Sequence, residues 1–426
     1  MTDSRIRLLT FCALLSAVTA TPAAHAKSIA PPPAGRVLLG VDRLITYHLP
    51  QLQGKRVGLL THKAGVTGTG RPTVEALLDR GVDLRALFAP EHGIYGAVEG
   101  GFDVTNTTYR RTGIPVHSLY GKTRRPTPKM LAGLDVVLVD LQDVGARFYT
   151  YISTVCYLLE EAAKAGVAVW VLDRPNPIGG LRVDGKTLER HRLGFTGIYP
   201  MPLLHGMTMG EMAWMLNEEY GYKARLKVVP MQGWRRDMFF GQTGLKWVAP
   251  SPNLPTWEST LIYPGLETIG LHGFLAEGRG TPYPFQLVGA PWVKDPEGLA
   301  RRLSDEGLRG LSFIPCRFTP AADALKGRRC GGVRMIVKDA RRVDPMRIPL
   351  KILKVLKIMY PGAPGWQDAA RSWSVSLGLP GGAGHLLLPG AEDELLRKWR
   401  LGAREFEATR KKYLLYKVDP GPRQVD

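Results

Sequence analysis

The stretch LFAPEHGIYGAVEGG, from Leu87 to Gly101, places a glutamate and a histidine directly after an apolar segment. The glycine-rich end of the stretch carries a second glutamate, Glu99. A carboxyl group set against the apolar end of a strand has its protonated form favoured by desolvation, which is the state that a general acid requires. We therefore expect Glu91 to be presented at the strand end as a catalytic residue. Glu99 is either a second catalytic residue or a solvated loop residue.

Polar residues directly follow four strand-like segments in this part of the chain. They are Thr61 and His62, Glu91 and His92, Gln142 with Asp143 and Arg147, and Arg174 with Asn176. In an open α/β sheet, ligands bind beyond the carboxyl ends of the strands. Each of these residues alone is explained by a cap or a turn, but the four groups together predict one site at one edge of the sheet.

The residue types at this edge fit the hydrolysis of a glycosidic bond. That reaction needs a carboxylic acid to protonate the leaving oxygen and a second group to handle the oxocarbenium-like centre. The pool of acids is Glu91, Glu99 and Glu277, the last in the segment EGRGT. Arg147 or Arg279 could hold a substrate carboxylate with two parallel hydrogen bonds. The other candidates for substrate binding are His62, His92, Asp143, Tyr149, Asn176 and Asn253.

Structural roles compete with these assignments. Asp143 and Arg147 have the spacing of an ordinary ion pair at a helix start. Arg279, between two glycines, suits a structural arginine that binds loop carbonyls. His62 and His92 are metal-ligand types, but no HExxH or other closely spaced pair accompanies them. We therefore expect no metal and no other cofactor.

The segment GLRVDGKT, residues 180–187, matches the letters of a phosphate-binding loop. Such a loop joins a strand directly to a helix, whereas here RPNPIG, with two prolines, separates it from the preceding strand. The segment also alternates like a small hairpin that turns at Asp184 and Gly185. We interpret the match as chance, and keep a nucleotide-dependent enzyme as an alternative.

The elements that carry these residues alternate between strand-like and helix-like segments. Apolar strands are expected at RVGLL, LRALFA, DVVLVDL, VAVWVLD and ARLKVVPM. Helices are expected at PTVEALLDRG, at residues 151–164 and at TMGEMAWMLNEEYG, where Thr208 and Glu211 have the spacing of a capping box. Apolar strands that alternate with helices predict a doubly wound parallel sheet covered on both faces.

After residue 250 the pattern changes to that of a second, smaller α+β domain. The segments SPNLPTWESTLIYPG and EGRGTPYPFQLVGAPW are rich in turn residues, and GGVRMIVKDA is strand-like. Two helices are expected at residues 344–362 and 391–416. We therefore expect a catalytic α/β domain over residues 36–250 and an auxiliary domain over residues 251–426 that closes the cleft.

Residues 1–26 have the features of a secretory signal peptide. Arg5 and Arg7 give a basic start, an apolar stretch too short for a membrane span follows, and AHA at residues 24–26 is a small-x-small cleavage site. We expect export to the periplasm or the extracellular space, with no stable membrane insertion. Cleavage would remove two arginines and one aspartate, and would lower the formal net charge from +19 to +18.

This positive charge favours an anionic partner through long-range attraction. Nucleic acid is not expected, because no aromatic-basic RNA motif, helix-turn-helix signature or zinc finger appears in the sequence. The alternatives are a basic surface without a specific partner and an anionic polymer such as cell wall. Cys316 and Cys330 could pair in an oxidising compartment, but their spacing does not require it.

Long blocks of the sequence resemble the exo-β-N-acetylmuramidases, a glycoside hydrolase family long catalogued as the domain of unknown function DUF1343. The blocks include VGLLTHKAGVT, LFAPEHGIYGAVEGG, SLYGKTRRPTPKML, DVVLVDLQDVGARFYTYISTV, LDRPNPIGG, PLLHGMTMGEMAWMLN, SPNLPT and EGRGT, and they span roughly residues 38–416. The resemblance implies a Rossmann-like domain plus an auxiliary domain, with the site in the cleft between them. It also implies removal of terminal N-acetylmuramic acid from the non-reducing end of peptidoglycan fragments, such as MurNAc-GlcNAc or muropeptides. The catalytic acid/base it implies is a glutamate, best matched by Glu91.

The chain departs from the family pattern in two places. After YPG the family usually reads something like CLFEGTN, whereas this chain has LETIGLHGFLA, in which Glu267 and His272 have no clear counterpart. The segment WSVSLGLPGGAGHLLLPG is also unlike the usual text. The main alternative is therefore a non-catalytic periplasmic protein that binds muropeptides in the same cleft.

Overall fold

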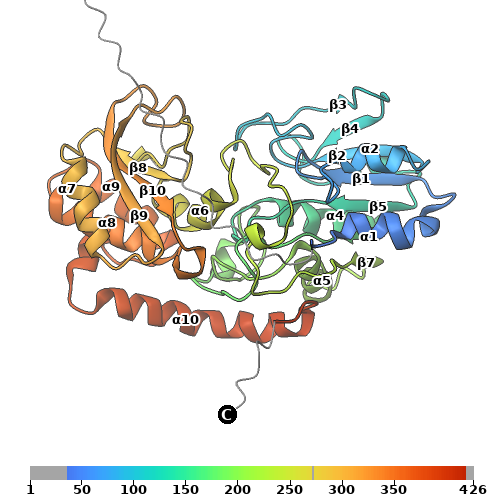
Figure 1. Ribbon diagram of the computed structural model, residues 1–426. Helices are drawn as coiled ribbons and strands as arrows, with labels where there is room; N and C mark the ends of the chain where they lie inside the picture. Colours follow the sequence, from blue (N-terminus) through green and yellow to red (C-terminus); the bar gives the residue numbers. More distant parts are fainter. Residues whose placement is uncertain (1–35, 271–272, 419–426) are drawn as a thin grey trace, which may run out of the picture. The chain divides into compact units, whose positions relative to one another are not determined.

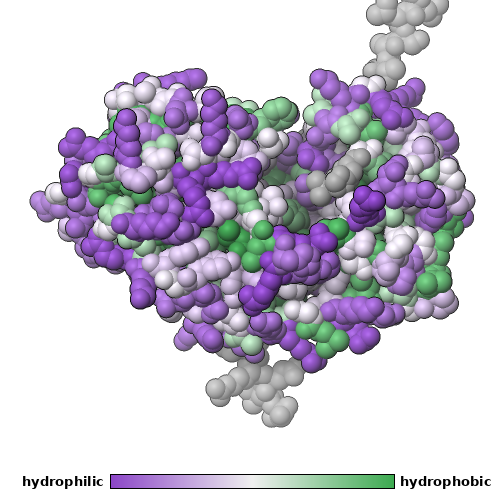
Figure 2. All heavy atoms as spheres, turned by 180° about the vertical axis from the view of Figure 1, so that it is seen from behind, coloured by the Kyte–Doolittle hydropathy of each residue, from purple (hydrophilic) through white to green (hydrophobic). Residues whose placement is uncertain are grey.

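The computed structural model describes residues 36–270 and 273–418. The expected signal peptide and His272 lie outside these residues. Within the described ranges, no helix is long and apolar enough to cross a membrane. Hydrophilic residues cover most of the face shown in Figure 2.

A seven-stranded sheet forms the framework of the first part of the described chain (Figure 1), with the spatial order β3-β4-β2-β1-β5-β6-β7. Its strands are β1 (Val57–Thr61), β2 (Leu84–Ala89), β3 (Thr107–Thr108), β4 (Pro115–Ser118), β5 (Val136–Asp140), β6 (Ala168–Leu172) and β7 (Leu226–Val229). Neighbouring strands are parallel except β3 and β4 at one edge, which are antiparallel. The five predicted strands are present, and the short β3 makes the sheet mixed.

Helices cover both faces of this sheet because successive residues of its strands are apolar on both sides. The helices of this part are α1 (Gly40–Arg43), α2 (Thr73–Leu78), α3 (Pro128–Leu131), α4 (Tyr151–Ala165) and α5 (Met209–Glu219). On one face, Leu60 and Val137 belong to the same core cluster as α4 and α5. On the other face, Leu59 and Leu138 cluster with residues of α1 and α2. This is the doubly wound arrangement that the sequence predicts.

The ends of α4 and α5 follow from local residue types. Thr208 caps α5: its Oγ1 accepts a hydrogen bond from the backbone N–H of Glu211 at 3.3 Å, and its own N–H donates to Glu211 Oε2 at 3.0 Å. This is the predicted capping box. Helix α4 ends at Gly166, whose φ of 67° is left-handed and favours glycine.

A smaller domain follows, built on a separate three-stranded antiparallel sheet with the order β8-β10-β9 (Figure 1). Its strands are β8 (Leu287–Ala290), β9 (Leu311–Phe318) and β10 (Cys330–Val337). Its helices are α6 (Trp257–Gly270), α7 (Pro296–Asp305), α8 (Arg347–Met359), α9 (Trp366–Ser376) and α10 (Ala391–Arg410). Helix α7 packs on β9 and β10, and α8 packs on α6 and α7. The predicted fold class, a doubly wound α/β domain with a smaller α+β domain, is confirmed.

The cysteines of the smaller domain are free thiols. In the β9–β10 pair, Cys330 lies opposite Phe318, and Cys316 lies opposite Gly332. The two cysteines are therefore on neighbouring strands but not in register, and the disulfide that the sequence permits is not formed.

Helix α6 corrects the reading of SPNLPTWESTLIYPG as a turn-rich segment. Pro264 lies inside this helix and removes one of its backbone hydrogen bonds. The helix persists because its apolar residues, such as Leu261 and Ile269, are buried. Gly265 permits a close approach: a Cβ at this position would lie 2.1 Å from the carbonyl oxygen of Pro345. Tertiary packing thus overrides the local helix-breaking signal.

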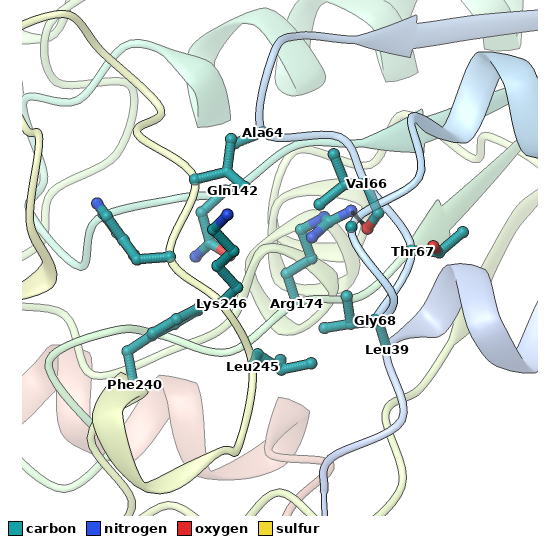
Figure 3. Close-up of a pocket in the computed structure, with 13 residues that line it drawn as sticks. Leu39, Ala64, Val66, Thr67, Gly68, Gln142, Arg174, Phe240, Leu245 and Lys246 are labelled. Atoms are coloured by element: carbon teal, nitrogen blue, oxygen red, sulfur yellow. Dashed lines mark hydrogen bonds between the residues drawn. The ribbon is translucent and has the colours of Figure 1, made fainter.

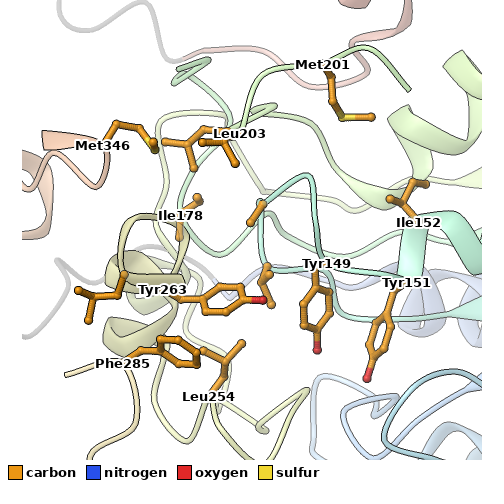
Figure 4. Close-up of a cluster of buried hydrophobic side chains, with 14 of the residues drawn as sticks. Tyr149, Tyr151, Ile152, Ile178, Met201, Leu203, Leu254, Tyr263, Phe285 and Met346 are labelled. Carbon is orange, nitrogen blue, oxygen red and sulfur yellow. The ribbon is translucent and has the colours of Figure 1, made fainter. Parts of the chain in front are cut away.

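One hydrophobic core cluster runs through both sheets. Besides strand residues, it contains Tyr149 and Tyr151 at the start of α4, Tyr263 of α6, and Phe285 before β8 (Figure 4). The domain boundary near residue 250 stays a prediction.

The last described residues pack against the first domain. Arg410, which ends α10, donates to the backbone carbonyl oxygens of His205 at 3.2 Å and Gly206 at 3.0 Å. The hydroxyl of Tyr416 donates to Oδ2 of Asp173, directly after β6. Burial raises the pKa of Asp173 to about 6, although the hydrogen bond from Tyr416 opposes the rise.

Candidate active site

Glu91 lies just beyond the carboxyl end of β2, as expected, and donors hold its carboxyl group from several sides. The Oγ1 of Thr150 donates to Oε2 at 2.6 Å, and the backbone N–H of Gly101 donates to Oε1 at 2.8 Å. The hydroxyl of Tyr120 also hydrogen-bonds to Glu91. Burial, followed by the charge of Glu91, raises the pKa of Tyr120 to about 12. These contacts fix the orientation of the Glu91 side chain, which remains partly exposed.

The loop after Glu91 is closed by His92. The backbone of His92 is left-handed, with φ at 70°, a conformation that is uncommon outside glycine and is enriched for histidine, asparagine and aspartate. Its Nδ1 hydrogen-bonds to the carbonyl oxygen of Val98 at 2.8 Å, and burial lowers its pKa. Further along the loop, Glu99 is exposed, and its side chain makes no hydrogen bond or ion pair with the described residues. The structure thus places His92 as an anchor of the Glu91 loop and leaves Glu99 in solvent.

The neighbouring strands β1 and β5 deliver a buried polar cluster to the same edge. His62 Nε2 accepts a hydrogen bond from the backbone N–H of Gln142 at 3.0 Å, and burial holds the pKa of His62 well below its usual value. Asp143 Oδ2 accepts from the backbone N–H of Gly145 at 2.8 Å and lies 3.4 Å from Nε2 of His205. Asp143 is buried, and its other oxygen has no hydrogen-bond partner among the described residues.

Arg147 is a buried residue whose guanidinium binds backbone carbonyl oxygens. Its Nη1 donates to the carbonyl oxygens of Lys186 at 2.6 Å and Met201 at 2.8 Å. Burial lowers its pKa to about 10. The helix-start pair with Asp143 that its spacing allows is not formed.

The two candidate asparagines lie in turns. Asn176 Nδ2 donates to the carbonyl oxygen of Met207 at 3.0 Å, and its Oδ1 accepts from the N–H of Ile178 at 3.2 Å. Asn253 is half-buried in a turn in which its N–H donates to Ser251 Oγ at 3.2 Å. Asn176 therefore orders the loop after β6, while the side chain of Asn253 makes no hydrogen bond in the described chain.

A series of aromatic rings connects the Glu91 edge with the smaller domain. The Tyr151 hydroxyl donates to the carbonyl oxygen of Pro250 at 2.8 Å and lies 3.3 Å from that of Glu91, and its ring lies 4.6 Å from that of Tyr149. Tyr149 lies 6.4 Å from Tyr263, and Tyr263 lies 4.7 Å from Phe285, both edge to face. Figure 4 shows the hydroxyl of Tyr263 directed toward Tyr149. All four rings are buried, so they form a packed core between the Glu91 edge and the smaller domain and do not offer free faces to a sugar ring.

The far end of this series carries a cluster of acids around Arg279. Its guanidinium bonds to Glu277, lies 2.9 Å from Asp323 and lies 3.6 Å from Glu267. Burial raises the pKa of Glu277, although the charge of Arg279 opposes this rise. A cavity of about 220 Å³ is lined by Glu277, Arg279 and Asp323 and by mostly small residues, which include Gly270, Gly273 and Ala324. Arg279 is therefore an ion-pairing centre at a cavity.

Glu267 is a further acid near Arg279, and the sequence analysis names it only as a residue without a clear family counterpart. It lies near the end of α6, and burial raises its pKa to about 7, with the charge of Arg279 opposing the rise. The available signal was a lone acid in the apolar run LIYPGLETIG.

Tyr263 marks the point at which these groups come together. Burial raises its pKa well above the usual value, and the charges of Glu267, Glu91 and Asp143 raise it further. The positive charge of Arg279 acts in the opposite direction. Acids from β2, β5 and α6 thus act on one tyrosine, whereas Glu99 is not among the groups that do so.

A second, much smaller cavity of about 20 Å³ lies near Arg174 (Figure 3). Arg174 is buried and paired with Asp140 at 2.6 Å, and its guanidinium also donates to the carbonyl oxygen of Val66. This cavity holds about one water molecule, so it is too small for a sugar ring.

Residues 180–187 do not form a phosphate-binding loop. No helix follows them directly, and the carbonyl oxygen of Gly180 accepts hydrogen bonds from Arg236 and Arg410. Asp184 is bridged to Leu204 rather than paired within a hairpin. The described residues contain no group of three or more histidines, cysteines, aspartates or glutamates placed to hold a metal ion.

The structure thus combines a doubly wound α/β domain, with carboxyl groups beyond its strand ends, and a smaller α+β domain. Residues 57–258 match the family described as exo-beta-N-acetylmuramidase NamZ, N-terminal, and residues 261–416 match its C-terminal counterpart. The chain therefore belongs to the exo-β-N-acetylmuramidase NamZ family, and it is a glycoside hydrolase.

Individual relatives agree with this assignment. The chain is 39% identical over 411 residues to the peptidoglycan beta-N-acetylmuramidase NamZ of Bacillus subtilis (strain 168), covering 94% of this chain and 96% of that protein. Two crystal structures of DUF1343 family proteins from Bacteroides fragilis are also similar. One has a TM-score of 0.79 at 35% identity, covering 90% of this chain and all of that protein. The other has a TM-score of 0.69 at 25% identity, covering 90% and 99% of the two chains.

Proposed function

We propose that this chain releases terminal N-acetylmuramic acid from the non-reducing end of peptidoglycan fragments, with Glu91 as a catalytic carboxyl group. The observation that carries the proposal is the setting of Glu91 in a region matched by the family. Its carboxyl group stands beyond β2, is oriented by Thr150 and Gly101, and remains partly exposed. A positioned carboxyl group of this kind is what glycoside hydrolysis requires.

The cluster around Arg279 supports a substrate with a carboxylate. N-acetylmuramic acid carries one on its lactyl group, and arginine binds carboxylates through parallel hydrogen bonds. Burial raises the pKa of both Glu267 and Glu277, so protonation of these acids leaves the charge of Arg279 less compensated. In this proposal Arg279 binds the lactyl group, and Glu277 positions the guanidinium.

The proposal is tested with the disaccharide MurNAc-GlcNAc and a chromogenic muramic acid glycoside. We expect the wild-type chain to release muramic acid from both, and Glu91→Gln to lower kcat/KM by roughly 10²–10⁴-fold. Glu99→Gln, an equal change on the exposed part of the same loop, is the matched control and should retain activity. Stoichiometric binding of the disaccharide without turnover would instead support a muropeptide-binding protein.

We also propose that the chain is exported, on the strength of the basic, apolar and small-x-small pattern of residues 1–26. Cell fractionation and N-terminal sequencing test this. The expected product begins at Lys27 outside the cytoplasm, and an uncleaved cytoplasmic protein would contradict the proposal.

A further inference from the structure

Glu267 is a buried acid without the donors that normally accompany an ionised carboxylate. Its side chain is 15% exposed, and its Oε2 has no hydrogen-bond partner among the described residues. The guanidinium of Arg279, 3.6 Å from Oε2, is beyond hydrogen-bonding distance. A buried ionised group without hydrogen bonds is costly, so these surroundings favour the protonated acid.

The groups that face Glu267 act in both directions. Arg279 favours the ionised form, while the negative charges of Glu277, Asp323 and Glu91 favour the neutral form. Burial outweighs the attraction of Arg279 and raises the pKa of Glu267 to about 7. The group therefore holds its proton up to about neutral pH and can still release it.

The carboxyl group of Glu91 has the opposite surroundings. Thr150, Gly101 and Tyr120 all donate toward it. Both acids raise the pKa of Tyr263, a residue of α6 whose ring lies 6.4 Å from that of Tyr149. A pair of acids with unlike environments in one site is the arrangement from which separate acid and base roles arise.

We infer that Glu267 is the catalytic acid that protonates the glycosidic oxygen, and that Glu91 is the carboxylate that works opposite it. The inference rests on the proposed function. As the bond between the anomeric carbon and the glycosidic oxygen breaks, its electron pair stays on that oxygen, which takes the proton of Glu267. Water supplies a hydroxyl group to the anomeric carbon, and its remaining proton restores the protonation of the two carboxyl groups. Arg279 compensates the charge that forms on Glu267.

The leaving group provides the test, because an acidic phenol needs little help from a proton donor, whereas a sugar alcohol needs it. We expect Glu267→Gln to lower kcat on MurNAc-GlcNAc by roughly 10²–10⁴-fold. On the 4-nitrophenyl glycoside of N-acetylmuramic acid, the loss should be less than about tenfold. Glu258→Gln, the same change at the start of α6, is the matched control and should leave both rates unchanged.

A loss of equal size on both substrates, with a melting temperature no lower than that of the wild type, would show that Glu267 does not act as the proton donor and would overturn the inference. Wild-type rates on the disaccharide would overturn it as well. If the wild-type chain hydrolyses neither substrate, the proposed function itself fails, which is a different result.

The wild-type chain gives an independent reading that does not depend on the folding of a variant. Activity on the disaccharide should be present at acid pH and fall as the pH rises through about 7, because the acid must be protonated. The nitrophenyl glycoside should lack this alkaline fall. Identical alkaline limbs for the two substrates would contradict the role of Glu267.

Discussion

Glu91 and Glu267, the two acids of the proposed mechanism, come from regions with different construction. Glu91 stands on a loop at a strand end, where Thr150 of the segment before α4 and the backbone of Gly101 supply hydrogen bonds. Glu267 stands in the buried part of a helix, with an oxygen that lacks any hydrogen-bond partner in the described chain. The loop has backbone N–H groups that can donate to Glu91, whereas the backbone N–H groups around Glu267 are engaged in the hydrogen bonds of the helix.

The difference shows how one fold can give two like acids unlike surroundings. Backbone N–H groups are free for a side chain only where they are not engaged in regular structure. A carboxyl group on a strand-end loop can therefore be solvated by the protein, and one near a helix end in an apolar core cannot. Substitutions that change the surroundings of either acid should therefore have different effects.

Removing both acids gives the largest expected effect. In the double variant Glu91→Gln/Glu267→Gln, kcat/KM on MurNAc-GlcNAc should fall by roughly 10²–10⁴-fold. This fall should be about as large as that of the less active single variant. The losses do not multiply because both acids serve one transition state. Steady-state kinetics on all four proteins measures this, and fully multiplicative losses would mean that the acids act independently.

Removing a donor from Glu91 should have an intermediate effect. Thr150→Val deletes the 2.6 Å hydrogen bond to Oε2, and a hydrogen bond to a charged group contributes about 1.5–3 kcal/mol. We expect a fall in kcat/KM of roughly 10–100-fold, and substantial recovery in Thr150→Ser. Thr154→Val, one turn further along α4, is the control. If both valine variants lose equal activity, the effect is one of helix packing.

Asp173 provides a third buried acid that has donors but lies outside the acid pair. Tyr416→Phe removes its donor from the chain end and should lower the free energy of unfolding by about 1–3 kcal/mol. Since the pKa of Asp173 is raised to about 6, the cost should be larger at pH 8, where the group is ionised, than at pH 5. Denaturant titration measures it. Activity should be unchanged, and a selective loss of kcat would link Asp173 to the chemistry.

The smallest effect is a gain of stability in Glu267→Gln at alkaline pH. The pKa of Glu267 is raised from 4.5 to about 7 in the folded chain, so the folded state binds more protons between these values. Its stability therefore falls as the pH rises through this window. We expect Glu267→Gln to melt roughly 2–4 °C above the wild-type chain at pH 8 and at the same temperature near pH 4. A lower melting temperature at pH 8 would indicate that the charge of Glu267 is stabilising.

The sequence predicts the part of the site that depends on local patterns. The apolar runs that become β1, β2, β5 and β6 are evident in it, and so is the placement of Glu91 after one of them. Residue spacing is sufficient there because strand ends in a doubly wound sheet meet at one edge.

The half of the site around Glu267 depends on tertiary contacts that spacing does not encode. Pro264 and Gly265 are turn signals, yet they lie inside α6 because the helix is buried. The acids that surround Arg279 include Asp323, which is 44 residues away along the chain. Likewise, the two carbonyls that engage Arg147 lie 39 and 54 residues beyond it. Such contacts determine which charged residues are available for substrate.

Digestion of purified peptidoglycan fragments, followed by mass spectrometry, tests the central claim most directly. The wild-type chain should release free N-acetylmuramic acid from non-reducing ends and leave fragments shortened by one sugar. Glu91→Gln should leave the fragments intact, and Glu99→Gln should act like the wild type. Equal release by the wild type and Glu91→Gln, or cleavage only at internal bonds, would contradict the account.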